Sequence, residues 1–291
     1  MQALTEEERF NQLAKEVTID VKSPKWLKAF LKFLSWLPFP LGTIIFALFG
    51  VDCIKVLYYC LKNKTGQAIE TIYNSRNHWW KGLWNIGDAI WRQSANVKSV
   101  LGRGKFVERV IPILLEKTSK NSSPEEKIIF VSLGSGASIK LLNGISSSNA
   151  DKRRLKLALV DNDAKELESA KRKTVKMGLE TAVFCQTADQ FLTNPPEPFS
   201  IVEMVGLSEY IEDTLLEFCG KQIFKNLKPN GLFLGANFVS DEEEQPTHKV
   251  VRWPKLFYRP KEKLIGFLKN SGFEKIWTGD CGALVLWVAE K

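Results

Sequence analysis

The sequence predicts an α/β fold, a doubly wound and mainly parallel seven-stranded sheet preceded by an N-terminal helical segment. Beyond residue 126, short β-rich apolar runs alternate with runs of helical periodicity, which indicates a sheet flanked by helices. Charge divides the 291 residues similarly: residues 1–120 hold 18 basic and 10 acidic side chains, and residues 121–291 hold 23 of each. We therefore expect a helical, aromatic and basic segment at 1–120 and the sheet domain at 121–291, joined by the polar stretch 119–126.

Composition excludes several other classes of protein. With 44% hydrophobic and 25% charged residues, the chain is neither disordered nor fibrous. Its five cysteines are odd in number and form no CxxC pair, and it has two histidines. We therefore expect no disulfide framework and no metal centre. The polar, acidic first 20 residues do not resemble a signal peptide, so the predicted location is cytoplasmic.

A basic, aromatic helix is predicted over residues 23–37. Lys25, Lys28 and Lys32 fall on one helical face. The other face carries the apolar residues Trp26, Phe30, Phe33, Leu34 and Leu37. This combination is typical of helices that lie on a membrane surface, although such a helix can also pack its apolar face on the rest of the protein. Residues 23–61 are therefore a candidate for peripheral contact with the inner face of a membrane.

The uncharged run at 33–51 just reaches the ~20 residues that a transmembrane helix needs. Pro38, Pro40, Gly42 and Gly50 interrupt it. We therefore expect a loop followed by a buried or membrane-dipping helix over 43–61, rather than a membrane span. Irregular helical structure is expected over 67–98, and a regular helix over 97–117.

The elements of the sheet domain follow in chain order. Helices are predicted at 138–145, 164–177, 214–227 and 261–270, with a turn at 228–231. Strands are predicted at 127–133, 155–160, 181–186, 199–205, 232–238, 273–278 and 283–289. The link between the last two strands is too short for a crossover helix, so we expect an antiparallel hairpin and hence an antiparallel last strand.

A glycine-rich loop directly follows the first predicted strand, where Gly134, Ser135 and Gly136 stand. Such a loop lets a ligand approach the backbone, and the following helix N-terminus favours a polar or anionic group. A dinucleotide fingerprint needs a third glycine at position 139, which is Ile139. A pyrophosphate site is therefore disfavoured.

An acid ends the second predicted strand. The carboxylate of Asp161 can accept hydrogen bonds from both hydroxyls of a ribose. Its alternative role is to cap the next helix, but Asp163 directly precedes that helix and suits this role better. Asp189 follows the third strand, where it is either a ligand contact or a solvated loop acid.

Together the segments LGSGAS and LALVDNDA resemble the first two motifs of class I S-adenosylmethionine-dependent methyltransferases. The resemblance implies a Rossmann-like methyltransferase sheet and S-adenosyl-L-methionine as cofactor. It assigns the glycine loop to the methionine part, Asp161 to the ribose, Asn162 and Asp189 to the adenine, and Val205 to the border of the sulfonium. The acid that usually precedes the first motif's glycines is replaced by Ser132.

A second resemblance concerns residues 206–211 (GLSEYI) and 252–260 (RWPKLFYRP). These segments are similar to those of hydroxy fatty acid methyl ester biosynthesis methyltransferases. Arg259 is then a candidate to bind a substrate carboxylate in bidentate fashion, unless it pairs with an acid such as Glu209. Tyr258 and His248 are candidates to position a nucleophilic oxygen, and His248 or Glu209 could act as the base that a hydroxyl acceptor needs.

Methyl transfer mainly requires that the nucleophile be held in line with the activated methyl group, so no catalytic triad is expected. The sequence therefore predicts a methyltransferase that modifies an oxygen, or another nucleophile, of a small apolar or lipid-like substrate. Two alternatives stay open. One is a nucleic-acid methyltransferase whose basic N-terminal segment binds phosphates. The other is a non-catalytic cofactor-binding or membrane scaffold protein.

Overall fold

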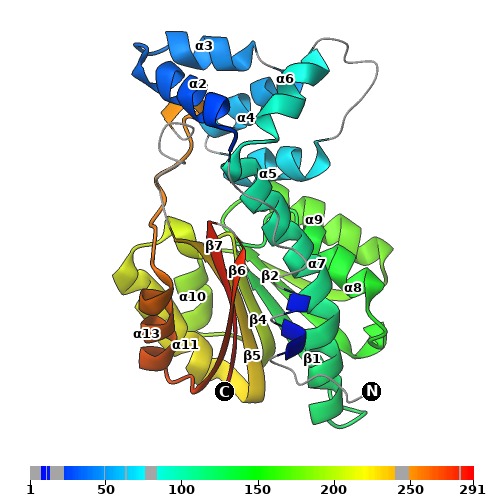
Figure 1. The fold of residues 1–291 in the computed structure, drawn as a ribbon. Coiled ribbons are helices and arrows are strands. Elements are labelled where there is room, and N and C mark those ends of the chain that lie inside the picture. The colour runs from blue at the N-terminus through cyan, green and yellow to red at the C-terminus, as the bar shows by residue number, and fades with distance from the viewer. Residues whose placement is uncertain are drawn as a thin grey trace.

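The computed structural model has a seven-stranded sheet at its centre (Figure 1). It describes residues 8–10, 12–13, 23–48, 50–62, 64–75, 84–239, 249–281 and 283–291. The strand order is β3-β2-β1-β4-β5-β7-β6, which confirms the predicted fold. The strands are β1 (Ile128–Leu133), β2 (Leu155–Asp161), β3 (Glu180–Cys185), β4 (Phe199–Val205), β5 (Leu227–Phe238), β6 (Lys275–Cys281) and β7 (Leu284–Glu290).

The last strand reverses direction, as expected. Strand β7 is antiparallel to both β5 and β6, whereas β1 to β5 pair in parallel. The turn expected at 228–231 is instead part of β5, as an irregularity in its pairing with β4. The register moves from the pair Phe199–Leu227 to the pair Ile201–Leu232, and Asn230 takes a φ of 58°. The turn-forming residues 228–231 therefore lie within a long strand. Pairing with β4 and β7 determines where that strand begins and ends.

Helices cover both faces of the sheet (Figure 1). Helices α7 (Ala95–Asn121), α8 (Ile139–Ser147) and α9 (Ala164–Lys176) lie on one face. Helices α10 (Ala188–Thr193), α11 (Asp213–Asn226) and α13 (Lys261–Ser271) lie on the other. Because side chains alternate along a strand, Phe130 points into one hydrophobic core and its neighbours Ile129 and Val131 into the other. This double burial explains why the parallel strands have nearly continuous apolar sequences.

Helix α7 joins the N-terminal segment to the sheet. It packs along α8 and also contacts β4, β5, β6 and β7. The helix ends at Asn121 rather than at the start of the polar stretch at 119. The expected boundary at residue 120 therefore coincides with the end of an element that covers the sheet.

Five further helices form a layer at one end of the molecule, here called the N-terminal cap (Figure 1). They are α2 (Lys25–Trp36), α3 (Leu41–Ala47), α4 (Val51–Leu61), α5 (Thr65–Asn74) and α6 (Trp84–Trp91). Among the described residues, no helix is both long and apolar enough to cross a membrane.

The single helix expected over 43–61 is wrong, because it divides into α3 and α4. The Asp88 carboxylate accepts hydrogen bonds from the amides of Asp52, at 3.0 Å, and Cys53, at 3.3 Å. It thereby satisfies donors at a new helix N-terminus. A Cβ atom at Gly50 would lie 2.0 Å from the same carboxylate oxygen, so this close approach requires glycine.

Candidate functional site

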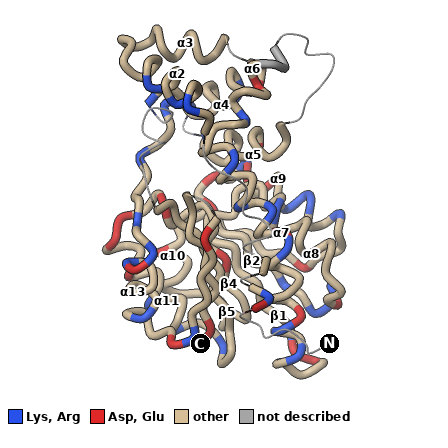
Figure 2. The backbone as a smooth tube through the Cα atoms, viewed as in Figure 1, with Lys and Arg blue, Asp and Glu red and all other residues tan. Residues whose placement is uncertain are grey.

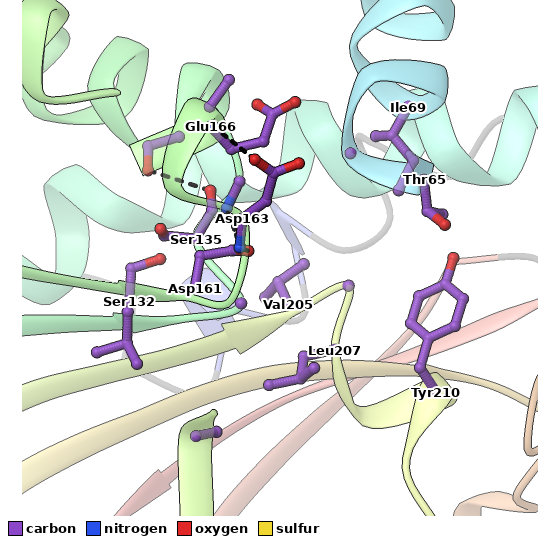
Figure 3. Close-up of a pocket in the computed structure, with 18 of the residues that line it drawn as sticks. Thr65, Ile69, Ser132, Ser135, Asp161, Asp163, Glu166, Val205, Leu207 and Tyr210 are labelled. Atoms are coloured by element: carbon purple, nitrogen blue, oxygen red, sulfur yellow. Dashed lines mark hydrogen bonds between the residues drawn. The ribbon is translucent and has the colours of Figure 1, made fainter. Parts of the chain in front are cut away.

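A cavity of about 520 Å³ lies where β1, β2 and β4 end, with α5 and α7 forming its opposite wall (Figure 3). In the strand order, β1 lies between β2 and β4, so the cavity is at the point where the winding of the sheet reverses. Ligands of open α/β sheets bind at this position. All seven residues predicted to hold the cofactor line the cavity: Gly134, Ser135, Gly136, Asp161, Asn162, Asp189 and Val205.

The glycine loop has the conformation that the residue types suggest. Gly134 and Gly136 have φ angles of 66° and 47°, in the left-handed region that favours glycine. A Cβ atom at Gly134 would lie 3.0 Å from Leu207, whereas no heavy atom is within 4 Å of the corresponding point at Gly136. The Ser135 hydroxyl is buried and has no hydrogen-bond partner among the described residues. The loop thus offers open backbone and an unused polar atom to a ligand.

The Asp161 carboxylate connects the first two loops of the site. Oδ2 accepts a hydrogen bond from the amide of Gly136 at 2.8 Å, and Oδ1 accepts one from the amide of Asp163 at 2.9 Å. A carboxylate has about four lone-pair positions, so two stay available to ligand hydroxyls. Asp163 caps α9, as expected, because it accepts from the amides of Lys165 and Glu166. Asp161 is therefore both an organiser of the glycine loop and an acceptor at the cavity.

Asp189 lies in a helix that was not predicted. It is in the first turn of α10, where Thr187 and Gln190 form a reciprocal capping box. The T-x-x-Q spacing was a readable signal for that helix start. Asp189 also lines the cavity, together with the exposed Asn162.

Glu203 is a cavity residue that was also missed. It stands on β4 in register with Ser132 of β1. The Ser132 hydroxyl donates to Oε2 at 2.6 Å, and the amide of Val205 donates to Oε1 at 3.2 Å. Burial raises the pKa of Glu203 to about 7. Strand β4 thus provides a carboxyl group beside Ser132. The sequence feature that could have indicated Glu203 is a single acid within the otherwise apolar strand FSIVEMV.

The cavity wall carries an excess of acidic side chains. Among the residues that the structure describes, three cationic ones line it, and two of these form ion pairs: Arg103 with Glu209 at 2.6 Å and Lys140 with Glu108 at 2.9 Å. The acidic lining residues are Glu70, Asp161, Asp163, Glu166, Asp189 and Glu203. Such a lining favours a ligand with cationic groups and disfavours a pyrophosphate.

The substrate clamp expected at Arg259 is not what the geometry provides. Its guanidinium is buried and donates to Asp213 Oδ1 at 2.8 Å, to Asn237 Oδ1 at 3.0 Å, and to the carbonyl oxygens of Ser208 and Ile211 at 2.8 Å and 2.5 Å. The alternative, that Arg259 pairs with an acid, is confirmed, but the acid is Asp213 and not Glu209. Arg259 thus ties the turn after β4 to β5 and α11.

The other candidate catalytic residues are not brought together at the cavity. Glu209 is buried, and its carboxylate accepts from Arg103. The ring of Tyr258 packs edge-on against Phe238, with 6.4 Å between the centroids. Neither residue lines the cavity. His248 lies outside the described residues.

Aromatic and apolar residues form the part of the cavity beyond Val205. Tyr210, from the turn after β4, points toward Thr65 and Ile69 of α5 (Figure 3). Its hydroxyl accepts a hydrogen bond from Trp253 Nε1 at 3.0 Å, and burial raises its pKa above the usual range. Tyr73 and Leu207 complete this wall. Sequence spacing could not indicate this set, because only the tertiary fold brings α5 opposite the strand ends.

No protein-family model and no curated protein matches the chain in sequence. Solved structures do resemble it. A possible exported protein from Bordetella parapertussis has 13% identity and a TM-score of 0.64, over 99% of each chain. The magnesium protoporphyrin IX methyltransferase of Synechocystis, solved with bound SAH (S-adenosylhomocysteine), has 10% identity and a TM-score of 0.55, over 82% of this chain and 99% of that one.

The CurJ carbon methyltransferase has 11% identity and a TM-score of 0.56, over 97% of this chain and 92% of that one. The chain has the Rossmann-like methyltransferase fold. At these identities the likeness concerns the fold alone. The structural similarity to the Bordetella protein covers 99% of each chain, so it includes the N-terminal helices.

Proposed function

We propose that the protein is an S-adenosylmethionine-dependent methyltransferase that modifies a nucleophilic atom of a small apolar or lipid-like substrate. The observation that carries the proposal is the convergence of the open glycine loop, the Asp161 carboxylate and an acidic lining on one cavity. A ligand with ribose hydroxyls, an ammonium and a sulfonium would find acceptors and negative charge there. When bound, S-adenosyl-L-methionine supplies a methyl group that is already activated.

The residues present fit this cofactor. The unpartnered Ser135 hydroxyl and the open backbone at Gly136 would hold its methionine part. Asp161 would accept the ribose hydroxyls, and Asn162 and Asp189 would contact the adenine. Glu203 and its neighbours would offset the positive charge of the ammonium.

The far wall of the cavity suits an apolar substrate. Tyr210, Leu207, Tyr73 and Ile69 offer aromatic and aliphatic surface beyond Val205. The raised pKa of Tyr210 keeps its hydroxyl protonated at neutral pH, and that hydroxyl already accepts from Trp253. Tyr210 is therefore placed to donate a hydrogen bond that orients an acceptor atom of the substrate. A carboxylate acceptor would need no base.

Calorimetric titration with S-adenosylhomocysteine tests the cofactor site. We expect micromolar binding that Asp161→Ala weakens by about tenfold to a hundredfold, since a charge-assisted hydrogen bond contributes about 1.5–3 kcal/mol. Asp161→Asn keeps an acceptor for one amide but removes the charge, so its loss should be intermediate. Asp151→Asn is the control, because this aspartate also caps a helical turn but does not line the cavity, and asparagine caps helices as well as aspartate does. Absence of binding to the folded protein, or equal binding by Asp161→Ala, would contradict the proposal.

A further inference from the structure

Exposed large apolar side chains are concentrated in the N-terminal cap. Within the part of the chain that the structure describes, twelve such side chains are exposed, and ten of them lie between residues 26 and 61. Trp36 is 75% exposed, Phe39 65% and Leu48 64%. The ten are Trp26, Phe33, Trp36, Phe39, Leu41, Ile44, Leu48, Ile54, Tyr58 and Leu61. Single exposed apolar residues are ordinary, but a cluster of this kind marks a docking surface.

Helix α2 has two apolar faces, and the protein covers one of them. Leu27, Leu31 and Leu34 follow one another at helical spacing and are buried in the core. Trp26 and Phe33 are seven residues apart on a different side and are exposed. Packing within the fold therefore accounts for the leucines and leaves the aromatic residues without a role.

The exposed face continues onto α3. Leu41, Ile44 and Leu48 are spaced as one helical stripe, and all three are exposed. Phe39 lies in the turn between the two helices. Helices α2 and α3 contact each other at the end of the molecule farthest from the C-terminus (Figure 1). We call the exposed side chains of this region the α2–α3 face: Trp26, Phe33, Trp36, Phe39, Leu41, Ile44 and Leu48.

Positive charge borders this face. Residues 23–62 contain five lysines and one acid, Asp52, which is buried. Figure 2 shows basic residues along α2, where Lys25, Lys28 and Lys32 share one side. The ammonium of Lys32 lies 5.6 Å from the centroid of the Trp36 ring. Lysines beside exposed aromatic residues complement an anionic surface that has an apolar interior.

We propose that the α2–α3 face docks on the surface of an anionic lipid bilayer. The aromatic and aliphatic side chains would enter the boundary between headgroups and acyl chains, and Lys25, Lys28 and Lys32 would contact the headgroups. A second copy of the chain is disfavoured as occupant, because both copies would bring the same lysines and no exposed acid from this segment. A nucleic acid would leave the aliphatic stripe of α3 uncovered. This inference is independent of methyl transfer.

Vesicle sedimentation tests the proposal. We expect the full chain to bind vesicles of two parts phosphatidylcholine to one part phosphatidylglycerol at least about tenfold more tightly than vesicles of phosphatidylcholine alone. The double variant Phe33→Glu/Trp36→Glu should weaken binding to the mixed vesicles by about tenfold or more, because it puts charge into the acyl boundary. Lys25→Gln/Lys32→Gln should reduce the preference for the mixed vesicles and leave the weak binding to phosphatidylcholine unchanged.

Matched controls come from α9, which also carries exposed residues. Val175→Glu changes an exposed apolar side chain, and Lys171→Gln/Lys176→Gln removes two exposed lysines. Both should bind vesicles as the unmodified protein does. All variants should keep the same thermal unfolding and the same S-adenosylhomocysteine titration, since every position is on the surface.

Three results would overturn the proposal. One is failure of the unmodified chain to bind the mixed vesicles. Another is undiminished binding by Phe33→Glu/Trp36→Glu. The third is sedimentation equilibrium showing a dimer that becomes a monomer in that variant, because the face would then belong to a second copy.

Discussion

Glu203 is a buried carboxyl group in the wall of the cavity. Its carboxyl group lines the cavity yet is buried in the sheet, and burial raises its pKa from 4.5 to about 7. The folded protein therefore holds a proton that the unfolded chain releases near pH 4.5. The associated stability is fully present below the unfolded pKa and is lost as the pH rises through the folded pKa.

We expect Glu203→Gln to flatten the dependence of stability on pH between about pH 4.5 and 7. Over this range the unfolding free energy of the unmodified protein should fall relative to the variant by up to about 3 kcal/mol, from the size of the pKa shift. Glutamine can still accept from the Val205 amide, so the fold should persist. Urea unfolding at the two ends of this pH range measures the change in unfolding free energy. An equal change for the unmodified protein and the variant would contradict the prediction.

The same carboxyl group should make cofactor affinity depend on pH. If Glu203 offsets the ammonium of the ligand, the affinity for S-adenosylhomocysteine should rise as the pH increases through about 7, because the carboxylate form is then populated. The rise should disappear in Glu203→Gln. Titration calorimetry in buffers of different protonation enthalpy measures the affinity and the proton release. An equal rise in both proteins would assign the dependence to another group.

Arg259 is expected to act on stability rather than on ligand binding. Replacing it by methionine removes the donor from the carbonyl oxygens of Ser208 and Ile211 and the ion-pair partner from Asp213, at a cost of about 3 kcal/mol or more. The affinity of the folded protein for S-adenosylhomocysteine should be unchanged. Lys263→Ala is the control, because this exposed lysine shares the Asp213 carboxylate and should contribute less than about 1 kcal/mol. An unchanged unfolding midpoint for Arg259→Met would contradict the structural role.

At the scale of elements, the start of α4 depends on a side chain from α6. We expect Asp88→Ala to destabilise the cap by about 1–2 kcal/mol, because the amides of Asp52 and Cys53 lose their acceptor. Amide hydrogen exchange should accelerate in α4 and stay unchanged in β1, β4 and β5. Asp88→Asn retains an acceptor and should lose about half as much. Equal acceleration throughout the sheet would show instead that the cap and sheet open together.

The whole molecule is organised around α7. The core on its side of the sheet contains residues of the cap, such as Leu27 and Phe46, together with Phe106 and Ile111 of α7 and Phe130 of β1. The cap and sheet therefore share buried surface through this helix. A division of the chain at 120 would separate α7 from the strands that it covers.

Truncation tests this organisation. A chain of residues 122–291 lacks α7 and exposes the apolar face of the sheet that α7 covers, so we expect it to aggregate or to lose cooperative unfolding. A chain of residues 94–291 retains α7 and should keep a cooperative but lower-temperature transition. Thermal unfolding followed by circular dichroism distinguishes the two. Cooperative folding of 122–291 would instead establish the expected boundary at 120 as a domain boundary.

Much of the fold could be predicted because its signals are local. Apolar runs marked the strands, the two glycines marked the turn after β1, and the position of Asp161 at a strand end placed it at the cavity. Each of these depends on residues close together in the chain, where backbone preference and side-chain periodicity act directly. The predicted sheet agrees with the observed one because these signals lie within short stretches of the chain.

The rest was decided by contacts between distant residues. The hydrogen bond between Ser132 and Glu203 joins residues 71 positions apart, and the one between Arg103 and Glu209 joins residues 106 positions apart. Arg259 forms its ion pair with Asp213. The Asp88 carboxylate accepts from the amide of Asp52 at the start of α4, within the single helix expected over 43–61. Local sequence was enough to place the seven strands in order, the glycine loop and Asp161. Which charges pair and which apolar face stays exposed depends on strand register and helix packing, because these bring together side chains that are far apart in the sequence.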